Sequence, residues 1–293
     1  TFENKNLKIK EPFKGLFTQG MVCHETYKDA DKNWLSPEEV ITINGKKYLK
    51  KDNTKEIKVG PSESMSKSKK NTIDPGKIIE NFGADSVRLF ILSDSPPEKD
   101  VQWSDEGIEA AHKFIQKLWA LHQNILNEIK LDNKNNSGNQ LEKFTNRFIK
   151  NITNNLNNFS YNIAVANLHE LYSFLNKEMR NEYTKDSIIK NYEKVLICMM
   201  PFVPHLASEA LEQINTNDIE WPKHDEKLLI EEKINYVIQI NGKKRSIIET
   251  KRGIKQDELM AQVFQEESLK KYLNDKEIKR KIFVPDKLIN III

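Results

Sequence analysis

The stretch from residue 65 to residue 89 marks the change from strands to helices along this chain. It reads Met65-Ser66-Lys67-Ser68-Lys69-Lys70-Asn71-Thr72-Ile73-Asp74-Pro75, and then, from residue 82, Phe82-Gly83-Ala84-Asp85-Ser86-Val87-Arg88-Leu89. From Val59 to about residue 73 the residues are small, polar and without periodicity, which predicts a mobile loop. Asp74 and Pro75 form an N-cap and a first-turn proline, so a short helix is expected to follow and to end at Gly83. A second helix is expected over residues 84–92.

Upstream, residues 1–73 are predicted to form strands and loops. Asn44-Gly45 is a type I′ turn signal between apolar residues 40–43 and 48–49, which predicts a β-hairpin. Downstream, Ser104 is an N-cap before a long helix with acidic residues in its first turn. Apolar residues then recur at helical spacing as far as residue 214, interrupted by a polar stretch over residues 132–140, and this pattern predicts an antiparallel helical bundle.

The pattern changes again after residue 222. Alternating apolar residues 234–240 precede a second hairpin signal, Asn241-Gly242, and a helical stretch and two closing strands follow. The expected fold is therefore multidomain, α/β plus α, with boundaries at 1–100, 101–223 and 232–293. The last part is a small α+β domain.

Composition limits the class of protein. The chain has 293 residues, of which 38% are hydrophobic and 9% aromatic, enough for packed cores. The sequence has neither an apolar run of about 20 residues nor a basic-then-apolar leader, so a membrane span and secretion are not expected. Cys23 and Cys198 are too few for a disulfide framework or a metal cluster, and we expect reduced thiols, a cytoplasmic location and no protein-bound metal.

The net charge of +3 conceals two basic regions. Residues 46–70 hold nine lysines and three acids, and residues 232–293 hold fourteen Lys or Arg and nine acids. Two such regions favour contacts with polyanions. AT-biased coding, which enriches lysine, isoleucine and asparagine together, explains the charge equally well.

The tetrapeptide Met65-Ser66-Lys67-Ser68 carries the clearest chemistry. An ammonium flanked by hydroxyls on a flexible loop suits a triphosphate, and a lysine closing over departing pyrophosphate would stabilise its charge. For four residues alone, a solvated Lys/Ser loop is an equally good interpretation.

The longer context resembles class I aminoacyl-tRNA synthetases of the leucine, isoleucine and valine branch. Stretches from residue 237 to residue 293, with residues 284–290 the clearest, resemble the C-terminal domain of the bacterial leucyl-tRNA synthetase family. Residues 11–22, 34–40 and 201–207 fit the same family in the same order. The resemblance thus covers essentially the whole chain. It implies that residues 1–100 are the end of a class I Rossmann catalytic domain with its signature loop. Residues 101–223 would be a helical bundle of the anticodon-binding type, and residues 232–293 a C-terminal α+β domain that binds tRNA.

The resemblance implies ATP-dependent activation of leucine, with Mg²⁺ accompanying ATP, and its transfer to tRNA(Leu) by a monomeric enzyme. Lys67 would be catalytic. The ATP-binding residues would be Ser64, Met65, Ser66, Lys67 and Ser68, with Gly20, Met21 and Val22 on a strand beside the nucleotide. A plain buried strand is an equally good interpretation of those last three. Ser64 stands where the family has a lysine, which removes one charge.

Eight basic residues of the last domain are candidates for tRNA contact, with a solvated face as the alternative. They are Lys243, Lys244, Arg245, Lys251, Arg252, Lys279, Arg280 and Lys281. In the family this domain touches the outer corner of the tRNA, where shape and phosphates are read.

The family's second ATP motif, of the His-x-Gly-His type, does not occur in the sequence, and Thr1 is not a methionine. We therefore expect a C-terminal piece that does not activate leucine alone. The alternatives are a stand-alone tRNA-binding protein derived from a synthetase, and a valyl- or isoleucyl-tRNA synthetase fragment.

Overall fold

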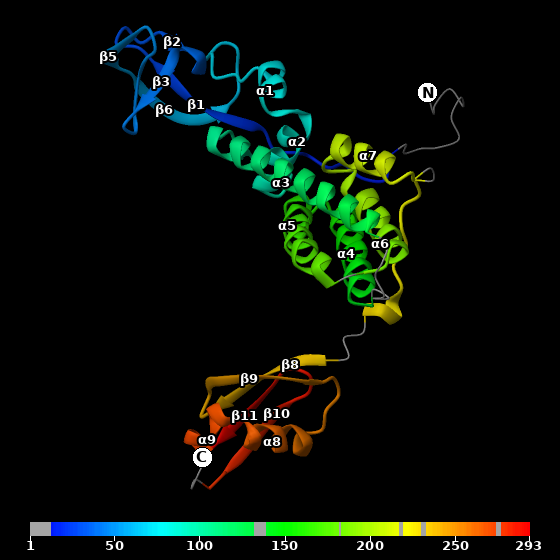
Figure 1. The fold of residues 1–293 in the computed structure, drawn as a ribbon. Coiled ribbons are helices and arrows are strands. Elements are labelled where there is room, and N and C mark those ends of the chain that lie inside the picture. The colour runs from blue at the N-terminus through cyan, green and yellow to red at the C-terminus, as the bar shows by residue number, and fades with distance from the viewer. Residues whose placement is uncertain (1–12, 132–138, 182, 217–218, 230–232, 274–276) are drawn as a thin grey trace, which may run out of the picture. The chain divides into compact units, whose positions relative to one another are not determined.

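The computed structural model describes residues 13–131, 139–181, 183–216, 219–229, 233–273 and 277–293 (Figure 1). Its chain divides into two compact units, residues 1–224 and residues 225–293. The predicted mixed α/β class is confirmed. Among the described residues, no helix combines the length and the apolar character that a bilayer span requires.

The first unit begins with strands. A four-stranded sheet has the order β2-β1-β6, with β7 added in parallel to β1, and β3-β4-β5 form a separate antiparallel sheet. The strands are β1 (Val22–Lys28), β2 (Trp34–Leu35), β3 (Val40–Ile43), β4 (Lys46–Leu49), β5 (Asp52–Glu56), β6 (Lys58–Ser64) and β7 (Val101–Gln102). The turn between β3 and β4 is confirmed, with Asn44 and Gly45 both at positive φ.

The predicted start of the loop at Val59 is wrong. Residues 58–64 form β6, which pairs antiparallel with β1 from Cys23↔Ser64 to Lys28↔Lys58. Pairing with β1 overrides the weak local signal of this Gly- and Ser-rich stretch, and Gly60 and Pro61 lie where the register shifts at Glu25/Thr26. The loop itself is residues 65–74, called the lysine loop below.

The helices follow the predicted order, and Asp74 and Ser104 cap α1 and α3 as expected. The helices of the first unit are α1 (Pro75–Phe82), α2 (Ala84–Asp94), α3 (Asp105–Lys130), α4 (Asn139–Asn157), α5 (Tyr161–Glu178), α6 (Lys185–Met199) and α7 (Pro204–Gln213). Of the predicted polar stretch 132–140, residues 132–138 lie outside the described residues, whereas Asn139 and Gln140 begin α4.

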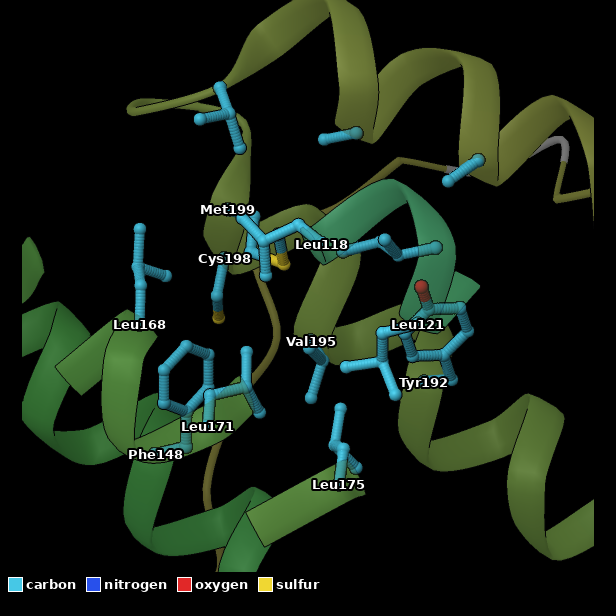
Figure 2. Close-up of a cluster of buried hydrophobic side chains, with 14 of the residues drawn as sticks. Leu118, Leu121, Phe148, Leu168, Leu171, Leu175, Tyr192, Val195, Cys198 and Met199 are labelled. Carbon is cyan, nitrogen blue, oxygen red and sulfur yellow. The ribbon is translucent and has the colours of Figure 1, made fainter. Parts of the chain in front are cut away.

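One hydrophobic core holds the bundle together, because each of its helices turns an apolar stripe inward. Side chains of α3, α4, α5 and α6 meet in the cluster drawn in Figure 2. Its labelled members are Leu118, Leu121, Phe148, Leu168, Leu171, Leu175, Tyr192, Val195, Cys198 and Met199. Leu89 of α2 belongs to the same core, so buried packing continues across residue 100. The division into domains at residue 100 stays a prediction.

The second unit is a four-stranded sheet of order β10-β11-β8-β9, with a helical pair packed on one face. Its elements are β8 (Lys233–Ile240), β9 (Lys243–Lys251), α8 (Gln256–Gln265), α9 (Glu267–Leu273), β10 (Arg280–Val284) and β11 (Leu288–Ile292). The helices cover Tyr236, Ile238, Ile289 and Ile291, which are fully buried. The Asn241-Gly242 hairpin is confirmed.

Candidate functional site

The lysine loop leaves the sheet at the end of β6. Ser64 is the last residue of that strand, and the backbone N–H of Met65 donates to the carbonyl of Val22 at 3.2 Å. The loop therefore starts beside the first residue of β1. The structure in this way brings Val22 together with the predicted residues 64–68.

Lys67 stands exposed on a tight turn between two serines. The hydroxyls of Ser66 and Ser68 lie 2.7 Å apart, and the N–H of Lys70 donates to the carbonyl of Lys67 at 3.3 Å. Lys70 has a φ of 55°, which reverses the chain. The turn thus presents one ammonium and two hydroxyls to solvent, a donor set that suits phosphate oxygens.

The charges near the loop are not all equivalent. Lys69 forms an ion pair with Glu63 of β6, so its charge is partly offset by the carboxylate. The hydroxyl of Ser64 faces the buried thiol of Cys23, with Oγ and Sγ 4.0 Å apart.

Gly20 and Met21 are placed differently from residues 64–68. The strand begins at Val22, so the expectation that all three residues form a strand is wrong for the first two. Gly20 donates to the carbonyl of Pro97 at 2.8 Å, and a Cβ at this position would lie 2.1 Å from the carbonyl oxygen of Lys99. This close backbone approach requires glycine. Met21 is exposed, and its N–H donates to the carboxylate of Asp100 at 2.8 Å.

Two side chains in and after the loop were not singled out by sequence reasoning. Asn71 is fully buried although the residues on both sides of it are exposed. Asp85 of α2 is buried and accepts from the N–H of Leu206 at 2.8 Å and from His205 Nδ1 at 2.9 Å. Asp85 thereby caps α7 from a distant helix. The polar residues around Asn71 predict a turn, but the burial of its side chain depends on the sheet beneath the loop and could not be predicted from them.

The eight basic candidates of the second unit are all exposed, but the sheet divides them. Lys243 of β9 and Lys281 of β10 are aligned across the sheet, on its two edge strands. Lys281 pairs with Ile291, Ile291 pairs with Ile240, and Ile240 pairs with Lys243. Three strand spacings separate them by about 14 Å. Lys244, Arg245, Lys279 and Arg280 lie near this end of the sheet.

Lys251 and Arg252 lie toward the other end. Eight residues of extended strand separate Lys251 from Lys243, a distance of about 26 Å. Arg252 Nε lies 3.4 Å from the carboxylate of Asp286, so part of its charge is balanced. The predicted cluster is therefore two groups, of which the first carries six residues.

The first group gains two residues from α9. The Arg245 guanidinium lies 4.4 Å from the centre of the Tyr272 ring, and the Lys271 ammonium lies 5.1 Å from it. Cation–π contacts at exposed sites contribute about 0.5–1 kcal/mol each, which restricts the long side chains that make them. Lys271 and Tyr272 could not be joined to Arg245 from sequence spacing, because a helix and a strand contribute them.

Within the described ranges, no group of three or more His, Cys, Asp or Glu side chains could hold a metal ion. The donors at the lysine loop are cationic or hydroxyl groups, which suit phosphate oxygens better than Mg²⁺.

Two family models match the chain. Residues 57–104 match the tRNA synthetases class I (I, L, M and V) model, and residues 138–261 match the anticodon-binding domain of tRNA ligase. The first match contains the whole lysine loop with α1 and α2. The second begins in the bundle and extends into the second unit.

Curated relatives match the chain from end to end. The leucine–tRNA ligase of Orientia tsutsugamushi is 41% identical over 304 residues, which is 100% of this chain and 35% of that protein. Those of Rickettsia bellii and Maricaulis maris are both 38% identical, over 99% and 98% of this chain. The chain spans about a third of the length of these relatives.

A solved structure shares the fold. The Agrobacterium radiobacter LeuRS in a ternary LeuRS–tRNA–LeuAMS complex aligns with a TM-score of 0.65 and 23% identity over 78% of this chain and 30% of that chain. The likeness in fold agrees with the sequence matches, which cover nearly every residue. By these matches the chain belongs to the leucine–tRNA ligase family of class I synthetases.

Proposed function

We propose that this chain is the part of a leucine–tRNA ligase that supplies the ATP-phosphate loop and a tRNA-binding surface. The whole enzyme would activate leucine with Mg·ATP and transfer it to tRNA(Leu). The observation that carries the proposal is the exposed Lys67, set between two serine hydroxyls on a loop anchored to β1 and β6. The full-length matches to leucine–tRNA ligases support the choice of amino acid.

Lys67 would act on the leaving group. When the leucine carboxylate attacks the α-phosphorus, the bond to the bridging oxygen breaks and negative charge collects on pyrophosphate. A nearby ammonium stabilises this charge more in the transition state than in bound ATP, and so lowers the barrier. Ser66 and Ser68 would donate hydrogen bonds to phosphate oxygens.

The tRNA contact is assigned to the group of basic residues at the Lys243 end of the second unit. Phosphate contacts by lysine and arginine release counterions, so the affinity would fall with salt. Arg245 contacts the ring and the hydroxyl of Tyr272, which restricts its side chain and favours a defined contact over a diffuse one.

Recovery of tRNA from a cell extract tests this function directly. The tagged chain is incubated with bacterial tRNA, and the bound tRNAs are sequenced. We expect enrichment of leucine isoacceptors. Enrichment of isoleucine or valine isoacceptors, or of none, would contradict the assignment.

Variants at the two ends of the sheet locate the contact. Alanine at Lys243, Lys244 and Arg245 together should weaken tRNA binding and flatten its dependence on salt. Alanine at Lys251, Arg252 and Lys255, which also removes three exposed charges, is the matched control and should change both less. Equal effects would place the contact elsewhere on the unit.

A chimera tests the chemistry of the loop. This chain replaces the corresponding third of the Orientia tsutsugamushi leucine–tRNA ligase, and leucine-dependent ATP–pyrophosphate exchange is measured. By analogy with the loss of a single oxyanion donor, Lys67→Ala should lower kcat by about 10²- to 10³-fold. Lys58→Ala, a change of an exposed lysine on β6, is the control. A Lys67→Ala chimera as active as its parent would remove Lys67 from the mechanism.

A further inference from the structure

Asn71 is the buried member of an otherwise open loop. Its side chain has no exposed area, whereas Lys70 and Thr72 on either side are exposed. A primary amide taken out of water in this way needs a partner for each of its polar atoms. In this structure all the partners are backbone groups.

The amide of Asn71 joins three segments of the chain. Its Oδ1 accepts from the N–H of Ser66 at 2.8 Å. Its Nδ2 donates to the carbonyl of His24 on β1 at 3.2 Å and to that of Glu63 on β6 at 3.1 Å. His24 and Glu63 are paired residues of β1 and β6, so Nδ2 donates to two residues that lie opposite each other on neighbouring strands. A third carbonyl, that of Ser64, lies at 3.5 Å.

These bonds close the turn that carries Lys67. The turn starts at Ser66 and ends at Asn71, and both ends meet at the one buried amide. The N–H of Lys70 bonds the carbonyl of Lys67 inside this closed turn. The backbone of Lys67 therefore has a fixed position relative to β1 and β6.

We propose that Asn71 is a positioning residue for Lys67, holding the turn that carries this exposed lysine against β1 and β6 through the hydrogen bonds of its buried amide. The positioning role rests on the proposed phosphate-binding function of the loop. The anchoring of the loop does not, and can be measured in this chain alone.

Asn71→Asp separates hydrogen bonding from packing. The two side chains have nearly the same shape, but an ionised carboxylate has no donor. In the variant an oxygen would face the carbonyls of His24 and Glu63, so the attraction becomes repulsion. Asn191→Asp is the matched control, because Asn191 is buried in α6 and donates to the carbonyl of Ser187 at 2.8 Å, away from the loop.

Hydrogen exchange and trypsin measure the anchoring. In the unaltered chain the amide of Ser66 should exchange at least about 10-fold more slowly than those of Lys67 and Ser68, since a buried acceptor protects it. Asn71→Asp should speed trypsin cleavage after Lys67 and Lys69 by about 10-fold or more, with exchange in the bundle unchanged. Unprotected Ser66, or cleavage no faster than in Asn191→Asp, would overturn the proposal. The exchange measurement needs no variant and decides the matter even if Asn71→Asp fails to fold.

Mg·ATP distinguishes positioning from anchoring alone. The chimera with the Orientia tsutsugamushi ligase is used here, because it contains the rest of the enzyme. Bound Mg·ATP should slow cleavage after Lys67 in the chimera, and the Asn71→Asp chimera should need at least about 10-fold more Mg·ATP for half protection. Equal protection in both would overturn the positioning role. If Mg·ATP protects neither chimera, the proposed phosphate-binding function of the loop fails together with the positioning role, while a protected Ser66 leaves the anchoring in place.

Discussion

The helical bundle and the lysine loop are held in place by different kinds of contact. The bundle relies on many apolar side chains from α3 to α7, packed in one core (Figure 2). The loop has a single fully buried side chain, Asn71, whose hydrogen bonds all go to backbone groups. Apolar burial is non-directional and additive over area, whereas hydrogen bonds fix geometry at small net gain.

The difference matters for how each region tolerates change. A core of this size loses one side chain and keeps its fold, although at a cost in free energy of unfolding. The anchoring proposed for Asn71 implies that the loop loses its geometry with one amide, while the free energy of unfolding changes less. Stability and position would then be separable in this molecule, and four measurements test that separation.

The largest expected effect is in the core. Leu168 on α5 is fully buried, and Leu168→Ala should lower the free energy of unfolding by about 2–5 kcal/mol, from lost burial and the cavity left behind. All four tryptophans lie within residues 1–224, so their fluorescence during urea unfolding reports on this unit. Ile163→Ala, a half-exposed position on the same helix, is the control, at about 0.5 kcal/mol or less. Equal losses would contradict the packing described here.

A smaller effect is expected at Asp85, where α2 meets α7. Asp85→Ala leaves the N–H of Leu206 without its acceptor and should cost about 1.5–3 kcal/mol, the range for a hydrogen bond to a charged group. Asp94→Ala, at the exposed end of the same helix, is the matched control. Urea unfolding measures both variants. If the two lose the same free energy, Asp85 is not the cap of α7.

The bundle should also respond to pH through His122. Burial lowers the pKa of this fully buried histidine, although hydrogen bonding to Gln213 and the charge of Glu209 oppose the shift. The unfolded chain then holds more protons than the folded one below pH about 6.5. The free energy of unfolding should therefore fall as the pH drops through about 6.5, by at most about 1.4 kcal/mol per pH unit for this histidine. His122→Gln should flatten the fall, and an unchanged slope would exclude His122 as its source.

The smallest effect on stability is expected at Lys67. Its side chain is exposed, so Lys67→Ala should change the free energy of unfolding by about 0.5 kcal/mol or less. Thermal unfolding of the variant beside the unaltered chain measures it. A loss above about 1 kcal/mol would mean that the Lys67 side chain stabilises the fold. The position of the loop and the stability of the fold would then not be separable at Lys67.

Local patterns set the secondary structure. The caps Asp74 and Ser104 start helices, and the two Asn-Gly pairs make hairpins, because each of these preferences depends on the residues immediately around it. Helical periodicity likewise predicted the core-facing stripes of the bundle, since the period of the helix alone decides which side chains share a face. The class of protein was inferred from a longer run of residues that includes the Met65-Ser66-Lys67-Ser68 loop.

Tertiary structure decided what no local pattern contains. Residues 58–64 became a strand because β1 offers a partner, and the predicted basic cluster divided because two of its residues lie at the other end of the sheet. In the sequence, Asn71 is indistinguishable from the other polar residues of the loop. In the fold, β1 and β6 lie beneath it and supply the carbonyls that accept from its buried amide. Burial and pairing are properties of the assembled chain, because they depend on residues that are distant in sequence. The sequence by itself predicted which groups would carry the proposed chemistry, and the fold determined where these groups are held.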